Sequence, residues 1–473
     1  STLEAVAAPI LWCALTGTLG YGALVTSNVV PIRQFGAVLA VCTAVAAVLT
    51  LAIAPVAMLP PFRLEIPVRP GSASRASAAM NRLTAWVYRH PGPIVAGTLA
   101  VVLPVTAGMW FLRYESNYVN AFKPDSRVVG DYRFVEAKLG GIGLVYLVVP
   151  VPATVDVATL ETFRALDAEL AALRDAEGRP ATAQVLSLAT VLDPDGRLAT
   201  LGPGPRARAL ATKLELIGAS PQAGLLRGFW NPEAGRARVM VRIREQQPAP
   251  VKEATFARAT ALAGSAFGPG VSLTGLSHLL TQTTRGVIGT QWSTFFWSAG
   301  SILLMLSIAF RGPKLAVLAL LPTLLAVGLV LGLMGWMGVK LDLATALVAS
   351  VALGLSVDDT FHCLLQFRRR RAVAAFRESL FSSYAVTGPG VLLSSLAVAV
   401  GFAVLRFSQF VPFSNFGTMV GIATAGSSLG NLVLLPACLT LGRRWRVART
   451  AARGVGGRAP RHSGGIFGRP RRT

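Results

Sequence analysis

Long apolar stretches recur along the chain and define its organisation. A helix that crosses a bilayer needs about 20 predominantly apolar residues. Eight stretches meet or approach this length, at about 8–27, 35–59, 93–112, 292–310, 314–337, 341–366, 386–405 and 413–441. Buried helices of a soluble protein are the alternative, but the chain has too little polar sequence to cover eight of them. The pattern therefore predicts a polytopic α-helical membrane protein with about eight transmembrane helices.

The composition agrees with a membrane protein. Hydrophobic residues make up 53% of the 473 residues, charged residues only 14%, and the mean hydropathy is +0.55. Soluble domains carry about 25% charged residues, so an ordinary soluble enzyme is excluded, and so is a disordered chain. The cysteines at positions 13, 42, 363 and 438 all lie in apolar stretches, so we expect buried free thiols and no disulfide framework.

The net charge of +23 is unevenly distributed. Basic residues concentrate in segments that share one side of the membrane if the chain crosses eight times: 62–90, 311–314, 368–377 and 443–472. The short loops of the opposite side are almost bare. The positive-inside rule then places both termini in the cytoplasm, with the protein in the cytoplasmic (inner) membrane of a bacterium. The arginine tail lacks interleaved aromatic residues, so anionic lipid is the expected partner and nucleic acid is not.

A more polar segment, 114–291, separates the third and fourth apolar stretches. Its pattern predicts two β-α-β units, the first with a strand at 144–150, a helix at 157–175 and a strand at 183–188. The second has a strand at 237–243, a helix at 254–267 and a strand at 271–274. We therefore expect an extracytoplasmic α+β domain of ferredoxin-like units. The segment has no metal-binding spacing, nucleophile elbow or phosphate loop, and an isolated His278 is typical of a polar surface residue. A binding or conduit domain is expected here, and the protein is not expected to be an enzyme.

Two acidic residues interrupt the sixth apolar stretch. About nine residues separate Asp358 and Asp359 from the arginine run that follows, which at ~1.5 Å per residue places them roughly 13 Å into the membrane. A charged carboxylate at such depth costs about 2.5–3.5 kcal/mol. Carboxylates that hold and release protons inside a membrane are what a proton relay requires. The alternatives are that the pair ends the helix beyond the hydrocarbon, which the apolar residues after it disfavour, or that it serves as polar glue between helices.

Other polar and small residues accompany the acidic pair. His362 lies one helical turn after it, on the same side of the helix. Ser356 and Thr360 add hydroxyl groups nearby, and Gly354 would let a neighbouring helix approach closely.

The next apolar stretch offers partners for the carboxylates. Ser394 and Ser395 lie within it and could donate to the aspartates. Hydrogen bonds to the backbone of their own helix are the alternative.

The first two apolar stretches resemble the last two. At a constant separation of 381 residues, identical residues recur in the pairs Gly20 and Gly401, Pro31 and Pro412, Phe35-Gly36 and Phe416-Gly417, and Pro55 and Pro436. Parallel repeats of this kind are one way to build transporters. The pattern predicts that residues 1–60 close a first repeat whose second copy ends near 441.

The run Gly354-Leu-Ser-Val-Asp-Asp-Thr-Phe-His362, followed by arginines, resembles the signature of the resistance–nodulation–division (RND) superfamily. The similarity is greatest to the MMPL-like predicted exporters, which share the sterol-sensing-domain pattern. Weaker support comes from Leu273-Thr-Gly275, Arg311-Gly-Pro-Lys314 and Pro412-Phe-Ser-Asn-Phe-Gly417. The resemblance covers residues 1–445. It implies export driven by proton entry, with Asp358 and Asp359 at the positions of the family's relay carboxylates.

The resemblance also implies twelve spans in two halves. Against this pattern, the chain divides into two spans that end a first half (1–60), a cytoplasmic basic linker (61–91), one span (92–113), the α+β domain (114–291), a five-helix bundle (292–441) and a basic, disordered tail (442–473). We therefore expect a fragment that lacks its N-terminal half. Its two leading helices would then have nothing against which to pack their small residues, Gly17, Gly20 and Gly22.

The predicted function is a proton-motive-force-driven exporter of lipids or other hydrophobic molecules. Alternatives are a sterol-sensing-type lipid-binding regulator and a protein-translocation accessory. The expected partners are membrane lipids, the hydrophobic substrate, the missing half and a possible second copy. No metal or organic cofactor is expected, since the proton is the coupling ion, and no ATP-binding loop is present in the sequence.

Overall fold

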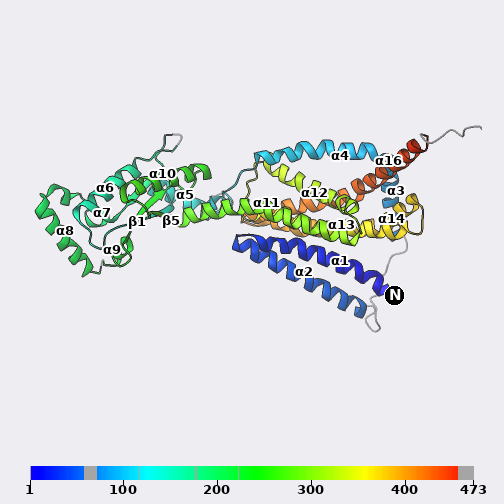
Figure 1. Ribbon diagram of the computed structural model, residues 1–473, viewed down its shortest axis with the longest axis horizontal. Helices are drawn as coiled ribbons and strands as arrows, with labels where there is room; N and C mark the ends of the chain where they lie inside the picture. The colour runs from blue at the N-terminus through cyan, green and yellow to red at the C-terminus, as the bar shows by residue number, and fades with distance from the viewer. Residues whose placement is uncertain (1, 58–71, 116, 176–177, 222, 456–473) are drawn as a thin grey trace, which may run out of the picture.

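The computed structural model describes residues 2–57, 72–115, 117–175, 178–221 and 223–455. A bundle of long helices carries an α+β domain at one end (Figure 1). Helix α1 (Thr2–Gly22) begins, and helix α16 (Leu435–Val455) ends, at the end of the bundle away from that domain. The first and last described residues therefore lie on the same side of the bundle.

Eight helical segments of the described residues are long and apolar enough to cross a membrane, as the sequence predicts. They are Pro9–Thr26, Val30–Ile53, Pro91–Phe111, Leu276–Ala309, Pro313–Trp336, Thr345–Arg371, Phe376–Phe407 and Val411–Trp445. The helices that supply them, besides α1 and α16, are α2 (Val30–Ala57), α4 (Pro91–Thr106), α11 (Leu276–Ala309), α12 (Pro313–Trp336), α13 (Val348–Arg371), α14 (Phe376–Ala403) and α15 (Val411–Leu429). The protein is thus a multi-pass membrane protein.

Two basic segments are more ordered than the sequence suggests. The predicted linker contains helix α3 (Ser72–Arg89), which packs on α14, where Met80 lies against Gly388. The described part of the tail, 442–455, is not disordered but continues α16. Apolar residues at helical spacing explain α3, since Met80, Thr84 and Val87 form its buried face. The remaining linker and tail residues lie outside the described ranges.

The α+β domain contains a five-stranded antiparallel sheet in the order β2-β4-β1-β5, with β3 paired to β4. The strands are β1 (Gly143–Pro150), β2 (Thr182–Leu186), β3 (Trp230–Asn231), β4 (Arg236–Ile243) and β5 (Ser272–Thr274). Helix α6 (Val157–Ala171) connects β1 to β2, and helix α10 (Ala249–Phe267) connects β4 to β5. Each connection skips over one strand of the sheet, so the two predicted β-α-β units interlock.

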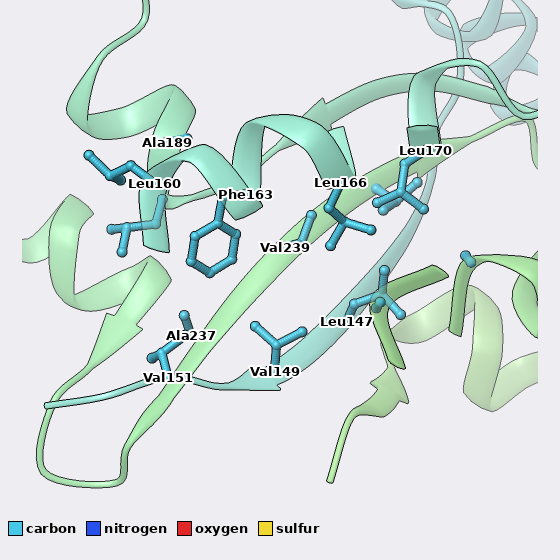
Figure 2. Packing of buried hydrophobic residues seen from close by; sticks show 14 of the residues in the cluster. Leu147, Val149, Val151, Leu160, Phe163, Leu166, Leu170, Ala189, Ala237 and Val239 are labelled. Atoms are coloured by element: carbon cyan, nitrogen blue, oxygen red, sulfur yellow. The ribbon is translucent and has the colours of Figure 1, made fainter. Parts of the chain in front are cut away.

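Alternation along the strands places the core on one face of this sheet. In β1, every second residue is buried, and in β4 the pattern is the same. Figure 2 shows the buried side chains of α6, including Phe163 and Leu166, packed over Leu147 and Val239 of the central strands. Phe163 also contacts Phe267 of α10, with ring centroids 4.6 Å apart. Both crossover helices therefore cover the same face.

The other helices of the domain are α5 (Arg127–Leu139), α7 (Leu188–Leu192), α8 (Pro203–Gly218) and α9 (Ala223–Phe229). Helices α7 to α9 extend the core beyond the end of α6 and were not expected from the sequence.

The internal repeat is present in three dimensions. A short 3₁₀ turn follows α1 at Ala23–Thr26, and an equivalent turn follows α14 at Val404–Phe407. Gly36 packs against Leu24 and the Tyr21 carbonyl, whereas Gly417 packs against Leu405 and the Phe402 carbonyl. Every one of these pairs is separated by the same 381 residues as the sequence matches. The turn and the close helix contact after it are therefore conserved features of both copies.

Helix α1 packs against α11 and α13 and helix α2 packs on α1, contrary to the expectation that their small residues lack partners, although nothing lies within 4 Å of the Cβ position of Gly22. Gly17 of α1 lies against Thr43 of α2, and Gly20 lies against Ile302 of α11. Ser298 of α11 donates a hydrogen bond to the Gly20 carbonyl, with an O–O distance of 3.0 Å. Small residues at these contacts let the helix backbones approach, which is how membrane helices associate.

An acidic pair between three membrane helices

Helix α13 runs through the centre of the bundle and carries both aspartates. It packs against α1, α12, α14 and α15. Successive residues of a helix point about 100° apart, so the carboxylates of Asp358 and Asp359 meet different neighbours. Asp358 faces α1, and Asp359 faces α14.

Asp359 is held by both serines that the sequence places opposite it. Ser395 Oγ donates to Asp359 Oδ2 at 2.5 Å, and Ser394 Oγ donates to Asp359 Oδ1 at 3.2 Å. Ser394 also bonds to the backbone carbonyl of Val391 in its own helix. Ser395 is 4% exposed and Ser394 is exposed, so the shorter bond is also the more protected one.

Asp358 has a different partner, Cys13 of α1, whose thiol interacts with its side chain. The same sulfur lies 3.6 Å from His362 Nε2. The second carboxylate oxygen of Asp358, Oδ1, is buried and has no hydrogen-bonding partner among the described residues. Sequence reasoning treated Cys13 only as an apolar thiol. Cys42, by contrast, is exposed in the structure and not buried as expected.

The repeat explains why Cys13 lies here. Cys13 and Ser394 are separated by 381 residues, the repeat distance. Helices α1 and α14 both flank α13, so the equivalent positions of the two copies reach adjacent carboxylates. The repeat register identifies Cys13 as a site residue from the sequence alone.

Gly354 lies one turn before the pair and permits the close approach of α1. A Cβ atom at this position would lie 2.7 Å from Cε1 of Tyr21. The structure thus places Gly354 at a close contact between α1 and α13.

The hydroxyl of Thr360 bonds to a different helix from those that meet the carboxylates. It donates to Asn431 Oδ1 at 2.7 Å, and the hydroxyl of Tyr384 donates to the Asn431 carbonyl at 3.1 Å. Asn431 lies in a π-helical turn, Gly430–Leu434, between α15 and α16. A π turn leaves backbone groups available for such bonds and is frequent at functional sites. Asn431 could have been found from the sequence, because an amide side chain in the middle of an apolar run marks a polar site inside the membrane.

Three buried polar atoms around the pair have no partner among the described residues. They are Ser356 Oγ, Asp358 Oδ1 and Asn431 Nδ2. Unpaired buried polar atoms are costly, and each of these could form a hydrogen bond with a bound water or with a neighbour that moves. Within the described residues no cluster of His, Cys, Asp or Glu has metal-binding geometry. The arrangement suits groups that take up and pass on protons.

A mostly apolar cavity of about 600 Å³ lies where the bundle meets the α+β domain. Its walls come from the start of α2, from α11, from the segment before α13 and from the start of α15. Phe35, Leu347, Phe410 and Phe416 are among its lining residues. The cavity is large enough for a hydrophobic molecule.

The sequence matches the MMPL family over residues 158–470, which is more than half of the chain. The chain therefore belongs to the MMPL family, in agreement with the resemblance drawn from the Asp358-Asp359 motif.

Two proteins are similar to this chain in sequence, and one solved structure is similar to it in fold. The membrane protein MJ1562 of Methanocaldococcus jannaschii is 30% identical over 163 residues, which are 34% of this chain and 39% of that protein. The apo-petrobactin exporter of Bacillus anthracis is 26% identical over 149 residues, 30% of this chain and 20% of that protein. The hedgehog release protein Disp of the water bear Hypsibius dujardini has a similar fold, with a TM-score of 0.64 at 14% identity. That likeness covers 93% of this chain and 59% of Disp. The chain thus spans only part of the length of each.

Proposed function

We propose that this protein is a proton-coupled exporter of lipids or other hydrophobic molecules in a bacterial cytoplasmic membrane. The observation that carries the proposal is the acidic pair, in which Asp359 is held by Ser395 of α14 and Asp358 lies against Cys13 of α1. Carboxylates inside a membrane bundle mark ion and proton pathways. Membership of the MMPL family and the similarity to a protein named as an exporter support the same class.

The geometry links the protonation of the pair to helix packing. A hydroxyl bond to an ionised carboxylate is roughly twice as strong as one between neutral groups. A proton that arrives at Asp359 therefore weakens the bond that Ser395 makes from α14. The two carboxylates face different helices, so protonation at one shifts the α13–α14 contact and protonation at the other shifts the α1–α13 contact. His362, whose Nε2 lies 3.6 Å from the Cys13 sulfur, would exchange a proton with Asp358 by way of that contact.

The substrate class follows from the cavity at the end of the bundle. Its lining is dominated by apolar side chains of α2, α11 and α15. An apolar surface of this kind favours a hydrophobic molecule over a polar one by about 25 cal/mol per Å² buried. No organic cofactor or resident metal enters the proposed mechanism.

We further propose that the α+β domain is a ferredoxin-like, extracytoplasmic domain and that both termini are cytoplasmic. The described parts of the basic segments and both described ends of the chain share the end of the bundle opposite the domain (Figure 1). Single cysteines introduced at exposed positions of α6, such as Glu169, should react with an impermeant maleimide in intact spheroplasts. A control cysteine at exposed Arg370 should react only after lysis. The reverse pattern would place the domain in the cytoplasm.

Coupling is tested by Asp358→Asn and Asp359→Asn, introduced separately into the chromosomal gene. Asparagine keeps the size of the side chain and removes the titrating group. Each variant should reach normal abundance and abolish export, measured by mass spectrometry of lipids extracted from the outer surface of the cells. Asp131→Asn, at an exposed position of the α+β domain, is the matched control. His362→Ala should have a smaller effect.

Export at the wild-type level by either aspartate variant would remove that residue from the relay. Unchanged surface lipids in a strain that lacks the gene altogether would instead favour the lipid-binding regulator.

A further inference from the structure

Three membrane spans begin or end at the same level of the bundle, on the side away from the α+β domain. Two of them begin at Pro91 and Phe376, and the third ends at Trp445. The helices involved are α4, α14 and α16, and α3 leads directly into α4 at this level (Figure 1). Residues beside the ends of a span lie at the height of the lipid headgroups. The side chains next to these three positions are therefore presented to the headgroup layer.

Helix α3 has two faces of opposite chemistry. Its buried face, which includes Met80 and Val87, packs on α14 and α16. Arg82, Trp86 and Arg89 are exposed, and at ~3.6 residues per turn they share one stripe on the opposite side of the helix. The sequence of α3 contains no acidic residue. Arginine and tryptophan on the exposed face of an interfacial helix are typical of a surface that contacts lipid headgroups.

Two further arginines flank the end of α3 and are held by specific contacts. Arg444 of α16 donates from Nη2 to the Tyr88 carbonyl at 3.0 Å. Arg377 of α14 lies over the Phe381 ring, 5.5 Å from its centroid, and the same ring meets Tyr88 edge-on with centroids 6.1 Å apart. Both guanidinium groups are thus positioned around Tyr88, which precedes Arg89 in the chain. We call Arg89, Arg377 and Arg444 the headgroup cluster.

The headgroup cluster keeps an excess of positive charge. Glu378, in the first turn of α14, is the one acid in the sequences of α3, α14 and α16. Arg443, which stacks over Phe376 at 4.8 Å, adds a further cation at the same level. A guanidinium has five N–H donors, so the bond from Arg444 to the backbone of α3 leaves donors for a phosphate. The cluster therefore combines charge with donors that are already held in place.

We propose that the headgroup cluster binds the phosphate of one anionic phospholipid in the leaflet away from the α+β domain. The two tryptophans at this level flank the glycerol region of the lipid: Trp86 is 51% exposed and Trp445 is 64% exposed, and indole rings favour this depth. A lipid fits better than an acidic protein segment because the ends of three spans surround the cluster and hold it against the bilayer. Unlike diffuse attraction to a basic tail, this is a single, saturable site.

The site is tested by lipid titration of the full chain in a mild detergent, followed by native mass spectrometry. The probes are dioleoylphosphatidylglycerol and dioleoylphosphatidylcholine, which share their acyl chains and differ in charge. The first phosphatidylglycerol should bind at least about tenfold more tightly than the first phosphatidylcholine, the effect of one or two basic residues at a membrane surface. Millimolar inorganic phosphate and polyglutamate should not displace it, because the acyl chains contribute to binding.

Paired variants separate the site from the general positive charge of this end of the bundle. Arg89→Gln with Arg444→Gln should weaken phosphatidylglycerol binding roughly tenfold or more and leave phosphatidylcholine unchanged. Lys314→Gln with Arg370→Gln is the matched control, since it removes the same charge from exposed positions outside the cluster. Its affinity should change less than about twofold.

Melting temperatures provide a second measurement on the same variants. All four substituted side chains are exposed, so without lipid both double variants should melt close to the wild type. A ligand that binds the folded state raises its melting temperature. Phosphatidylglycerol should therefore stabilise the wild type and the control, and should stabilise the Arg89 and Arg444 double variant less than half as much.

Four results would overturn the proposal. They are equal affinity for the two lipids, displacement by phosphate or polyglutamate, unchanged binding in the Arg89 and Arg444 double variant, and an equal loss in the control pair. The last would reduce the site to attraction by net charge. Because binding is measured without transport, Asp358→Asn should bind phosphatidylglycerol normally, and failure of the proposed export function would leave this result unchanged.

Discussion

Ser395 of α14 donates a 2.5 Å hydrogen bond to the Asp359 carboxylate of α13, across the interface between two membrane helices. The adjacent Ser394 reaches the other oxygen of the same carboxylate from an exposed position, while also bonding to its own helix. Two neighbouring serines thus make unequal contributions to one acidic residue.

Ser395→Ala should therefore impair the protein more than Ser394→Ala. The Ser395 substitution leaves Asp359 Oδ2 without its donor, and the expected loss of thermal stability corresponds to roughly 1–3 kcal/mol. Ser394→Ala removes a longer, solvent-exposed bond and should cost less than about 0.5 kcal/mol. Unfolding of both variants in the same detergent, together with surface-lipid export, measures the difference. Equal effects of the two substitutions would contradict the proposed asymmetry.

Gly354→Ala should separate α1 from α13. The added Cβ would meet the ring of Tyr21 at 2.7 Å, and overpacking of this kind typically costs about 1–3 kcal/mol. Gly390→Ala on α14 is the matched control, since nothing lies within 4 Å of its Cβ position. It should be neutral or slightly stabilising. A double variant with Tyr21→Leu should lose less stability than the sum of the single variants, and strict additivity would exclude this contact as the cause.

The stability of the α+β domain should depend on pH through the ionisation of Asp167. Burial raises the pKa of this carboxyl to about 6, against the bonds from Ser187 and Thr190, which lower it. The pKa of Asp167 is higher in the folded state than in the unfolded state, so its full contribution to stability is present below the unfolded-state pKa. That contribution is lost as the pH rises through 6. Asp167→Asn should therefore match the wild type near pH 4 and become more stable, by roughly 1–3 kcal/mol, above pH 6.

Asp156→Ala provides a control of opposite sign. Hydrogen bonds from Thr159 lower the pKa of Asp156, which caps α6. The contribution of Asp156 to the stability of the domain is present at neutral pH and disappears in acid. Melting temperatures of the full chain between pH 4 and 8 test both variants, and parallel pH profiles for the wild type and Asp167→Asn would refute the assignment.

A buried ion pair at the base of the α+β domain predicts a strong single-variant effect. Lys252 and Glu245 are both essentially unexposed, with a separation of 2.5 Å, and Ser277 donates to the other Glu245 oxygen at 2.7 Å. Lys252→Met leaves an uncompensated buried charge and should cost about 3–5 kcal/mol. The double variant with Glu245→Gln should recover more than half of this loss. A single variant as stable as the wild type would show that the pair does not hold the domain together.

Much of the fold could be predicted because membrane insertion leaves a strong local signal. Length and hydropathy locate all eight spans, and strict alternation locates β1 and β4. The start of α11 was missed by 16 residues, since its first turns lie outside the apolar run and carry polar residues such as Gln282 and Thr283. The short helices α7 to α9 were missed because their form depends on packing against α6 and β4, not on a local pattern.

Helical spacing predicts the candidate site only where its residues lie close together in the chain, and the repeat register is needed to reach Cys13. Asp359 and its two serine partners stand in adjacent apolar stretches, so helical spacing is enough to pair them. Cys13 is 345 residues away from Asp358 in the sequence and is brought there by the docking of α1 on α13. The π turn that presents Asn431 depends on backbone hydrogen bonds that no residue pattern specifies.

Helix α11 leaves the sheet directly after β5 and continues without interruption through 34 residues into the bundle. At ~1.5 Å per residue it is a stiff rod about 50 Å long. Its first turn is anchored beside Glu245 through Ser277, and farther along Ser298 bonds to Gly20 of α1. A tilt of only about 5° at the membrane end would swing the far end by roughly 4 Å, on the order of one strand spacing. A small tilt of α11 within the bundle can thus move the α+β domain at its other end by several ångströms.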